Sequence, residues 1–320
     1  SATPSIDSYF NATAGKYGLV ELSTRYGDCL MPEIITVDVK ELKRKKIMKD
    51  TLFSPLLVEK VREALSRGEQ AILFQNRRGF APMIECRGCG WVPHCVNCDV
   101  SLTYHKAHNQ LVCHYCGYTY RLPQVCPECK GTEFKMQGFG TEKVEGEIAG
   151  QFPAAKVERL DFDTARTRTA YERIISDFEK GKTQILIGTQ MLSKGLDFGN
   201  VSVVGILSAD SLMNFPDFRA HERAYQLMVQ VSGRAGRRDK RGTVILQTTQ
   251  PEHPLIRMVQ HFAYKEMVSL QLSERSMFRY PPYYRLIVLI LRSRNEEALQ
   301  EMSALYAEKL RARLGERVLG

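Results

Sequence analysis

The hydrophobic positions follow two alternating periods through the middle of the chain. Short apolar runs of strand length are separated by longer segments in which apolar residues recur every three or four positions, as on one face of a helix. The runs that predict strands are 35–39, 71–76, 156–163, 184–189, 201–210 and 242–248. The segments that predict helices are 55–67, 142–152, 168–181 and 218–232. Strands that alternate with helices in this way predict an α/β domain, a parallel sheet with helices on both faces.

The pattern changes after Pro251. Residues 254–277 are predicted to be helical, 280–294 (YPPYYRLIVLILRSR) to form a strand, and a long helix is expected to end at residue 313. This helix–strand–helix piece indicates the beginning of an α+β domain that the chain leaves incomplete. The abrupt start, SATPS, likewise suggests a part of a longer protein.

The segment from Cys86 to Cys129 interrupts the α/β pattern. It contains four C-x-x-C pairs, which hold eight of the nine cysteines; only Cys29 lies outside. Two C-x-x-C turns that face each other make a tetrahedral four-thiolate zinc site. The segment therefore predicts two structural zinc ions. A disulfide framework is disfavoured, because the chain shows no secretory segment and its cysteines are paired at ligand spacing.

The spacers between the pairs favour a nested arrangement of the two sites. Five residues separate Cys89 from Cys95, which is short for a chain that must turn back on its own knuckle, whereas fourteen separate Cys98 from Cys113. The inner site is then predicted to use Cys95, Cys98, Cys113 and Cys116. The outer site is predicted to use Cys86, Cys89, Cys126 and Cys129. A cross-braced arrangement, first pair with third and second with fourth, stays open as the alternative.

Composition and charge limit the possible partners. The chain has 320 residues, of which 43% are hydrophobic, and this is enough for two domains and an insert. Its net charge of +9 and pI near 9.0 favour a polyanionic partner. No apolar run is long enough to span a bilayer, so no membrane association is expected. Without a leader, and with thiols at metal-ligand spacing, the sequence predicts the cytoplasm.

The motif QVSGRAGR is the most informative one outside the cysteines. If the helix before it continued, Gln230, Arg234 and Arg237 would share one face, because they lie at helical spacing. Two guanidinium groups on one face suit the γ-phosphate of a nucleotide held by a neighbouring domain. Without that nucleotide both are expected to be solvated or loosely paired with acids. The alternative is an ordinary basic helix end, which the two glycines disfavour.

Two weaker motifs follow a predicted strand or a glycine turn. In GTQMLSKGLDF, Thr189 and Gln190 are predicted to contact a nucleic-acid phosphate, and Gly195 and Asp197 to face the nucleotide. In GFGTE, Thr141 is predicted to cap a helix whose start forms an anion site. A plain helix cap is an equal alternative.

The basic run 40–49 (KELKRKKIMK) is predicted to be a solvated linker, with phosphate contact as the alternative.

In this order the motifs resemble those of the superfamily-two helicases and, within them, the PriA family of replication-restart helicases. The matching segments are SATPS, ILFQNRRGFAP, the four C-x-x-C pairs, QGFGTEKVE, GTQMLSKGLDF, ADSLMNFPDFRAHER and QVSGRAGR. They extend over essentially the whole chain and correspond to the later part of such a protein. The two-zinc insert directly after NRRGFAP is the most specific of them.

The resemblance implies a division of the chain into domains. Residues 1–50 would be the end of the first helicase lobe and a linker, and 51–85 with 131–250 the RecA-like second lobe. Residues 86–130 would be the zinc insert, and 251–320 the start of a truncated C-terminal domain.

The resemblance also implies an activity. Such proteins use ATP and Mg²⁺ to unwind DNA from 3′ to 5′ at stalled, branched forks and assemble the primosome for replication restart. Their partners would include single-stranded and branched DNA, other primosome proteins, single-strand binding protein and the replicative helicase loader. SATPS would couple hydrolysis to DNA movement, and Arg234 and Arg237 would contact the γ-phosphate, with Gln230 beside them. Thr189, Thr141, Gln190 and Arg77 would contact DNA. The family's zinc pairing is the nested one.

One departure limits what this chain does by itself. It contains no G-x-x-x-x-G-K-[ST] phosphate loop and no acidic DExH-type box. The chain alone is therefore expected not to hydrolyse ATP. The competing hypothesis is a zinc-ribbon scaffold that binds DNA or protein without motor activity. Paired arginines after a parallel-sheet pattern favour the helicase, because a scaffold has no use for them.

Overall fold

The structure is a computed structural model of the chain. It describes residues 1–22, 30–48, 51–76, 83–105, 109–113, 115–136, 140–192, 196, 198–236, 241–293 and 295–318.

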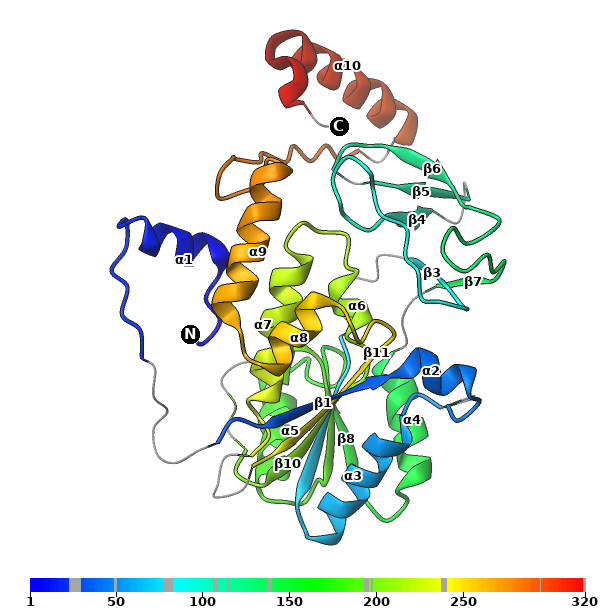
Figure 1. Cartoon of the computed structure of the whole chain (residues 1–320), viewed down its shortest axis with the longest axis vertical. Coiled ribbons are helices and arrows are strands. Elements are labelled where there is room, and N and C mark those ends of the chain that lie inside the picture. Colours follow the sequence, from blue (N-terminus) through cyan, green and yellow to red (C-terminus); the bar gives the residue numbers. More distant parts are fainter. Residues whose placement is uncertain are drawn as a thin grey trace.

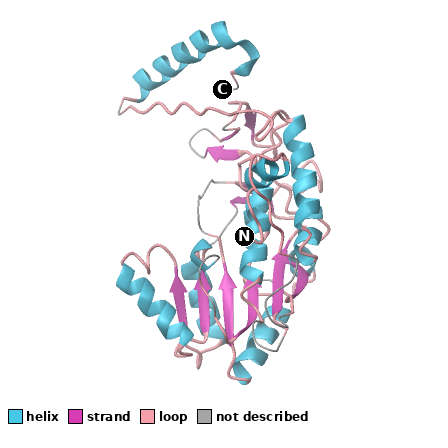
Figure 2. Ribbon diagram, turned by 90° about the vertical axis from the view of Figure 1, so that its left-hand side faces the viewer, coloured by secondary structure: helices cyan, strands magenta, loops and turns pink. Residues whose placement is uncertain are grey.

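A six-stranded parallel sheet in the order β1-β11-β10-β2-β9-β8 forms the centre of the molecule (Figures 1 and 2). Its strands are β1 (Glu33–Asp38), β2 (Gln70–Phe74), β8 (Val157–Leu160), β9 (Ile185–Gly188), β10 (Val201–Ile206) and β11 (Thr243–Thr248). The predicted strands are thus confirmed, with bounds shifted by one to a few residues. Because all strands are parallel, their carboxyl ends share one edge of the sheet.

Helices cover both faces of the sheet, as predicted. The helices of one face are α3 (Pro55–Ser66) and α4 (Thr141–Gln151), and those of the other are α5 (Arg168–Glu179), α7 (Ala220–Ser232) and α8 (Pro254–Gln260). The strands supply alternate side chains to the two cores: Ile72 and Phe74 pack on the α5–α7 side, and Ala71 and Leu73 on the α3–α4 side. A strand buried on both faces must be apolar throughout, which explains the continuous runs in the sequence.

Helix α3 illustrates how local sequence sets an element. The Ser54 hydroxyl accepts a hydrogen bond from the N–H of Leu57, and Pro55 occupies the first turn, where its missing N–H costs nothing. Gly68, at φ +71°, ends the helix in a conformation that disfavours side chains.

Two sequence expectations about the ends of the main domain differ from the structure. Strand β1 pairs with β11, so the sheet includes residues before 51, where the second lobe was expected to begin. Farther on, residues 280–293 form no strand within the described part of the chain. The side chains of Ile287 and Val288 there are 85% and 76% exposed, since no neighbouring strand pairs with this segment. That expected strand was wrong.

The remaining elements surround the main sheet. The helices are α1 (Ile6–Thr13), α2 (Val39–Arg44), α6 (Asp210–Met213), α9 (Tyr264–Met277) and α10 (Glu296–Leu314), with 3₁₀ turns η1 (Gln190–Leu192) and η2 (Gly315–Arg317). The predicted final helix is confirmed by α10. None of the described helices is long and apolar enough to cross a membrane.

The cysteine-rich insert leaves the main domain through an antiparallel pair of short strands, β3 (Ile84–Cys86) and β7 (Phe134–Met136). A three-stranded antiparallel sheet lies beyond it, made of β4 (Thr103–His105), β5 (Gln110–Val112) and β6 (Thr119–Arg121). In Figure 1 this insert lies above the edge of the main sheet, beside α9. We call residues 84–136 the zinc module.

Candidate metal centres and nucleotide-facing motifs

The eight cysteines of the zinc module form two clusters of four. Cys86, Cys89, Cys126 and Cys129 make one cluster, and Cys95, Cys98, Cys113 and Cys116 the other; within each cluster the four sulfurs lie within 4.8 Å of one another. The nested arrangement is therefore confirmed, and the cross-braced alternative is wrong.

The sulfur spacing fits a tetrahedral zinc site. The Sγ atoms of Cys86 and Cys129 are 3.5 Å apart, and those of Cys95 and Cys116 are 3.6 Å apart. A zinc–sulfur bond of about 2.3 Å in a tetrahedron places sulfurs about 3.8 Å apart. Four thiolates fill the coordination sphere, so both ions would be structural.

The four C-x-x-C turns share one backbone geometry. In each, the carbonyl of the first cysteine accepts a hydrogen bond from the N–H four residues later, over 2.9 to 3.0 Å. That later residue has a positive φ in every turn; the four are Gly90, Asp99, Gly117 and Lys130. Such a turn brings two thiols to one side of the backbone, which is how the local sequence prepares the ligands before they meet their partners.

Burial and backbone donors act in opposite directions on the thiols. Burial raises the pKa of Cys113 to about 11, whereas the N–H of Gly131 is the main cause that lowers the pKa of Cys129 to about 7. Zinc binds the thiolate form, so binding must displace protons from the buried thiols. Metal affinity is therefore expected to fall as the pH falls.

We expect the purified, reduced protein to hold two zinc ions. Cys113→Ser, which removes a fully buried ligand, should leave one ion, while Cys29→Ser, outside the described residues, should leave both. Chelation should unfold the zinc module alone, because the two cores of the main sheet do not depend on it.

Metal analysis checks the count, and the fluorescence of Trp91, the single tryptophan, reports the loss of local structure. A single ion in the unsubstituted protein would contradict the assignment.

The zinc module is seated on the main domain at two points. The Tyr280 hydroxyl donates to the carbonyl of Cys98 over 3.0 Å, and the Tyr280 ring stacks on Phe218 with centroids 4.5 Å apart. At the other zinc site, a Cβ added to Gly90 would lie 2.8 Å from the hydroxyl of Thr249, just after β11. The first contact ties a ligand-bearing turn to residues after α9, so the module has a defined position over the sheet.

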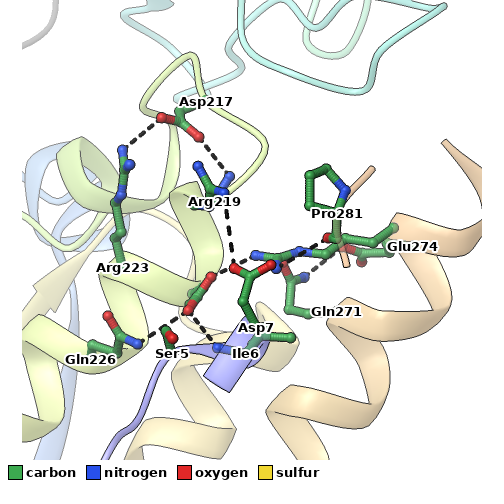
Figure 3. A network of polar contacts seen from close by, with 12 residues as sticks. Ser5, Ile6, Asp7, Asp217, Arg219, Arg223, Gln226, Gln271, Glu274 and Pro281 are labelled. Carbon is green, nitrogen blue, oxygen red and sulfur yellow. Dashed lines mark hydrogen bonds and ion pairs between the residues drawn. The ribbon is translucent and has the colours of Figure 1, made fainter. Parts of the chain in front are cut away.

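A buried ion pair joins α7 to α9 beneath this contact. Arg275 and Glu222 are 1% and 3% exposed, and Arg275 Nη2 lies 2.6 Å from Glu222 Oε2. The other Glu222 oxygen accepts hydrogen bonds from the N–H of Ile6 and from Gln226 (Figure 3). Arg275 also lies 5.2 Å from the centre of the Phe218 ring. Two helices, the chain start and the zinc-module contact thus meet at one carboxylate and one guanidinium.

The SATPS segment is fixed to the same helix α7. Gln230 Nε2 donates to the Thr3 hydroxyl over 2.9 Å, and the carbonyl of Pro4 accepts from Gln226 Nε2 and the Tyr264 hydroxyl, each over 3.0 Å. SATPS and QVSGRAGR are more than 220 residues apart in sequence and adjacent in the fold.

The arrangement predicted for QVSGRAGR is partly wrong. Helix α7 ends at Ser232, Gly233 forms its C-cap, and Gly236 has φ +71°, so Gln230 and Arg234 do not share one helix face. Arg234 is 8% exposed rather than solvated, and its guanidinium donates to the carbonyl of Leu196. This contact joins QVSGRAGR to GTQMLSKGLDF. Arg237 lies outside the described residues.

Thr141 differs from its predicted role as a helix cap. It is the first residue of α4, Gly140 is the N-cap, and no side chain caps the helix. The Thr141 hydroxyl is fully buried and donates to Asp161 over 2.6 Å. Burial raises the pKa of Asp161, but the hydrogen bond from Thr141 and other donors hold it below its usual value. The backbone N–H groups at the start of α4, rather than the hydroxyl, are left to face an anion.

Thr189 and Gln190 follow β9 at the carboxyl edge of the sheet. Thr189 is 6% exposed, and Gln190 Nε2 donates to Asn76 Oδ1 over 3.3 Å, which joins the ends of β9 and β2. Thr189 follows β9, and Thr141 bonds to Asp161, which follows β8. Because β8 and β9 are parallel, the two threonines lie at the same edge of the sheet. The other predicted contacts, Arg77, Gly195 and Asp197, lie outside the described residues.

Sequence reasoning missed the Glu222–Arg275 pair. The same charged segment, PDFRAHER, also carries an exposed ion pair, in which Arg223 lies 2.6 Å from Asp217. The available signal lay in α9, where Met267, Gln271 and Arg275 recur at intervals of four and are all buried. Two polar side chains, Gln271 and Arg275, on an otherwise apolar helix face indicate that buried polar partners lie opposite them.

Two regions of the chain match known protein families. Residues 95–121 match the family described as the PriA DNA helicase Cys-rich region (CRR) domain, and residues 139–239 match the helicase conserved C-terminal domain. The second match contains Thr141, Thr189, Gln230, Arg234 and Arg237.

Whole-chain comparison finds curated relatives with the same name. The chain is 44% identical to "Replication restart protein PriA" of Bacillus subtilis (strain 168), over 97% of this chain and 38% of that protein. The proteins of that name in Synechocystis and Haemophilus influenzae are 39% and 41% identical, over 94% and 88% of this chain and 37% and 38% of those proteins.

The parallel sheet, the helicase C-terminal match and the two four-cysteine clusters together define a RecA-like second helicase lobe with an inserted zinc module. The chain belongs to the PriA family of replication restart proteins. It spans about two fifths of the length of the curated relatives named above.

Proposed function

We propose that this chain is the second lobe and zinc module of an ATP-dependent 3′–5′ DNA helicase that recognises stalled replication forks and assembles the primosome. One observation carries the proposal: the three motifs expected to link ATP to DNA are in contact. Thr3 of SATPS bonds to Gln230, and Arg234 of QVSGRAGR bonds to the carbonyl of Leu196 in the segment after β9. A scaffold would need no such convergence.

Of these three contacting motifs, QVSGRAGR at the end of α7 is proposed to face the nucleotide. In the full-length protein, ATP and Mg²⁺ would be held by the phosphate loop of a first lobe, which this sequence does not contain. Arg237 is then the residue proposed to reach the γ-phosphate. Arg234 is proposed to position the segment that carries Gly195 and Asp197, because its guanidinium is bonded to Leu196.

The DNA side lies at the carboxyl edge of the sheet. We propose that the backbone N–H groups at the start of α4, together with Thr189 and Gln190, contact phosphates of the tracked strand. Arg77, three residues after the end of β2 in the sequence, is proposed as a further DNA contact. The partners proposed are branched and single-stranded DNA, other primosome proteins, single-strand binding protein and the helicase loader, in the cytoplasm of a bacterium.

We expect Thr189→Ala in the full-length protein to weaken DNA-stimulated ATP hydrolysis and leave nucleotide affinity nearly unchanged. The removed hydroxyl is the group proposed to contact a phosphate of the DNA strand. One hydrogen bond to a charged group contributes about 1.5–3 kcal/mol, which corresponds to a roughly 10- to 150-fold change in DNA affinity. Steady-state ATPase assays with and without forked DNA, beside binding of a fluorescent nucleotide, measure both quantities.

The chain of 320 residues, assayed alone, should show no ATPase activity. Turnover above background in that chain, abolished by Arg237→Ala, would place the nucleotide site elsewhere than proposed. Loss of nucleotide binding in Thr189→Ala would equally contradict the division of roles.

A further inference from the structure

A polar groove of about 370 Å³ separates the zinc module from the main domain and has no role in the function proposed above. Its lining includes Trp91 from the outer zinc knuckle, Lys40 from α2, Asn214 after α6 and Gln250 after β11. The volume falls within the range of about 300–1,000 Å³ that is usual for sites of small organic ligands. It lies over the β1–β11 end of the sheet, whereas Thr141 and Thr189 lie over the β8–β9 end.

The floor of the groove contains an unsatisfied polar group. Asn214 is 6% exposed, and its Nδ2 has no hydrogen-bond partner within the described part of the chain. A buried donor without a partner costs about 1–3 kcal/mol, so a ligand that supplies an acceptor oxygen would recover that energy. Gln250 beside it carries a second amide, which donates weakly to Asp210 over 3.4 Å.

The two walls of the groove differ in character. On the side of the zinc module, Trp91 offers an aromatic surface beside Glu128 and the thiolates of the outer zinc site, which together disfavour an anion. On the opposite side, the exposed Lys40 lies in the first turn of the basic helix α2 and forms no ion pair with the described residues. Lys45 on the same helix is instead paired with Glu41 over 2.6 Å.

We propose that this groove binds one nucleotide of single-stranded DNA, with its base stacked on Trp91 and its phosphate at Lys40. Aromatic stacking combined with a basic flank is how proteins hold single strands without reading sequence. The Asn214 amide would donate to an oxygen of the same nucleotide. The inference rests on the proposed function for its ligand class, and it gives Lys40, the first residue of the basic run 40–49, a contact with phosphate.

The groove keeps its shape because both walls are anchored. Gly90, next to Trp91, is in contact with Thr249, where no Cβ would fit, and β1 leads directly into α2. Figure 1 shows the β3–β7 pair of the zinc module above α2. A strand bound here would pass between the zinc module and the main domain.

The test uses the zinc-loaded chain and an oligothymidylate of about ten nucleotides. Because Trp91 is the single tryptophan, stacking should quench its fluorescence on titration. Anisotropy of a labelled oligonucleotide should show about tenfold weaker binding for Trp91→Ala and for Asn214→Leu. Lys40→Ala should make the slope of log K against log salt shallower by about 0.7, and Lys45→Ala, the matched control, should leave it unchanged.

The outcomes separate this inference from the proposed function. Oligonucleotide binding without quenching, and unaffected by Trp91→Ala, Asn214→Leu and Lys40→Ala, would overturn the groove while leaving the helicase proposal intact. Equal quenching by thymidine monophosphate, with no gain from chain length, would mean a free-nucleotide site and would also overturn it. A variant that loses both zinc ions is excluded from the comparison, and the other variants then decide whether the groove binds the oligonucleotide. The helicase proposal itself fails only if the full-length protein neither unwinds DNA nor hydrolyses ATP.

Discussion

Replacing Arg237 with alanine in the full-length protein is expected to lower DNA-stimulated ATP hydrolysis by about 10³- to 10⁵-fold. Negative charge develops on the γ-phosphoryl oxygens in the transition state, and a guanidinium placed against them stabilises that state far more than the bound nucleotide. Helix α7 ends at Ser232, and Gly236, which directly precedes Arg237 in the sequence, has a φ of +71°. Arg234 is engaged with Leu196, so Arg237 is the arginine proposed for the phosphate.

Arg237→Lys should also be strongly impaired, since lysine keeps the charge but loses the planar pair of donors. Arg241→Ala is the matched control: Arg241 is exposed and donates to the carbonyl of Met31 over 3.0 Å, so its loss should change turnover little. Fork affinity should be nearly the same in all three variants. If Arg237→Ala hydrolyses ATP normally and loses DNA binding, the roles of the nucleotide-facing and DNA-facing motifs are the reverse of those proposed.

Glu222→Gln is expected to destabilise the chain by about 3–5 kcal/mol. The substitution keeps the shape of the side chain but deprives the guanidinium of Arg275, only 1% exposed, of the carboxylate to which it is paired. It also weakens the acceptor for the N–H of Ile6, which holds the start of the chain against α7. Urea unfolding followed by circular dichroism measures the loss, and metal analysis shows whether the zinc module stays loaded.

The double variant Glu222→Gln with Arg275→Met should lose less than the sum of the single losses, because it removes both buried charges. Arg223→Ala serves as the control next in sequence. Its ion pair with Asp217 involves an Arg223 side chain that is 48% exposed, and a surface pair contributes about 0–1 kcal/mol. A loss for Glu222→Gln no larger than for Arg223→Ala would show that the buried pair does not hold α7, α9 and the chain start together.

The sequence by itself determined the features that depend on neighbouring residues. Strands buried on both faces must be apolar throughout, so the run at 71–76 marked β2, and helical periodicity bounded by Ser54 and Gly68 marked α3. The C-x-x-C turns identified the zinc ligands, since each pair is preorganised by its own backbone. Spacer length even favoured the correct pairing, because five residues after Cys89 are too few for the chain to turn back.

Only the tertiary structure decided contacts between segments distant in sequence. The residues around Thr141 predicted a helix cap, yet its hydroxyl donates a hydrogen bond to Asp161, which follows β8. Glu222 and Arg275 lie 53 residues apart, and nothing local marks either as the other's partner. The apolar run 286–291 has the local properties of a strand but no neighbour with which to pair in the described part of the chain, and the backbone hydrogen bonds of a strand require one. Local propensity thus determined the elements of the main sheet and the ligand turns, whereas long-range packing decided which polar groups meet and which apolar runs find a neighbouring strand.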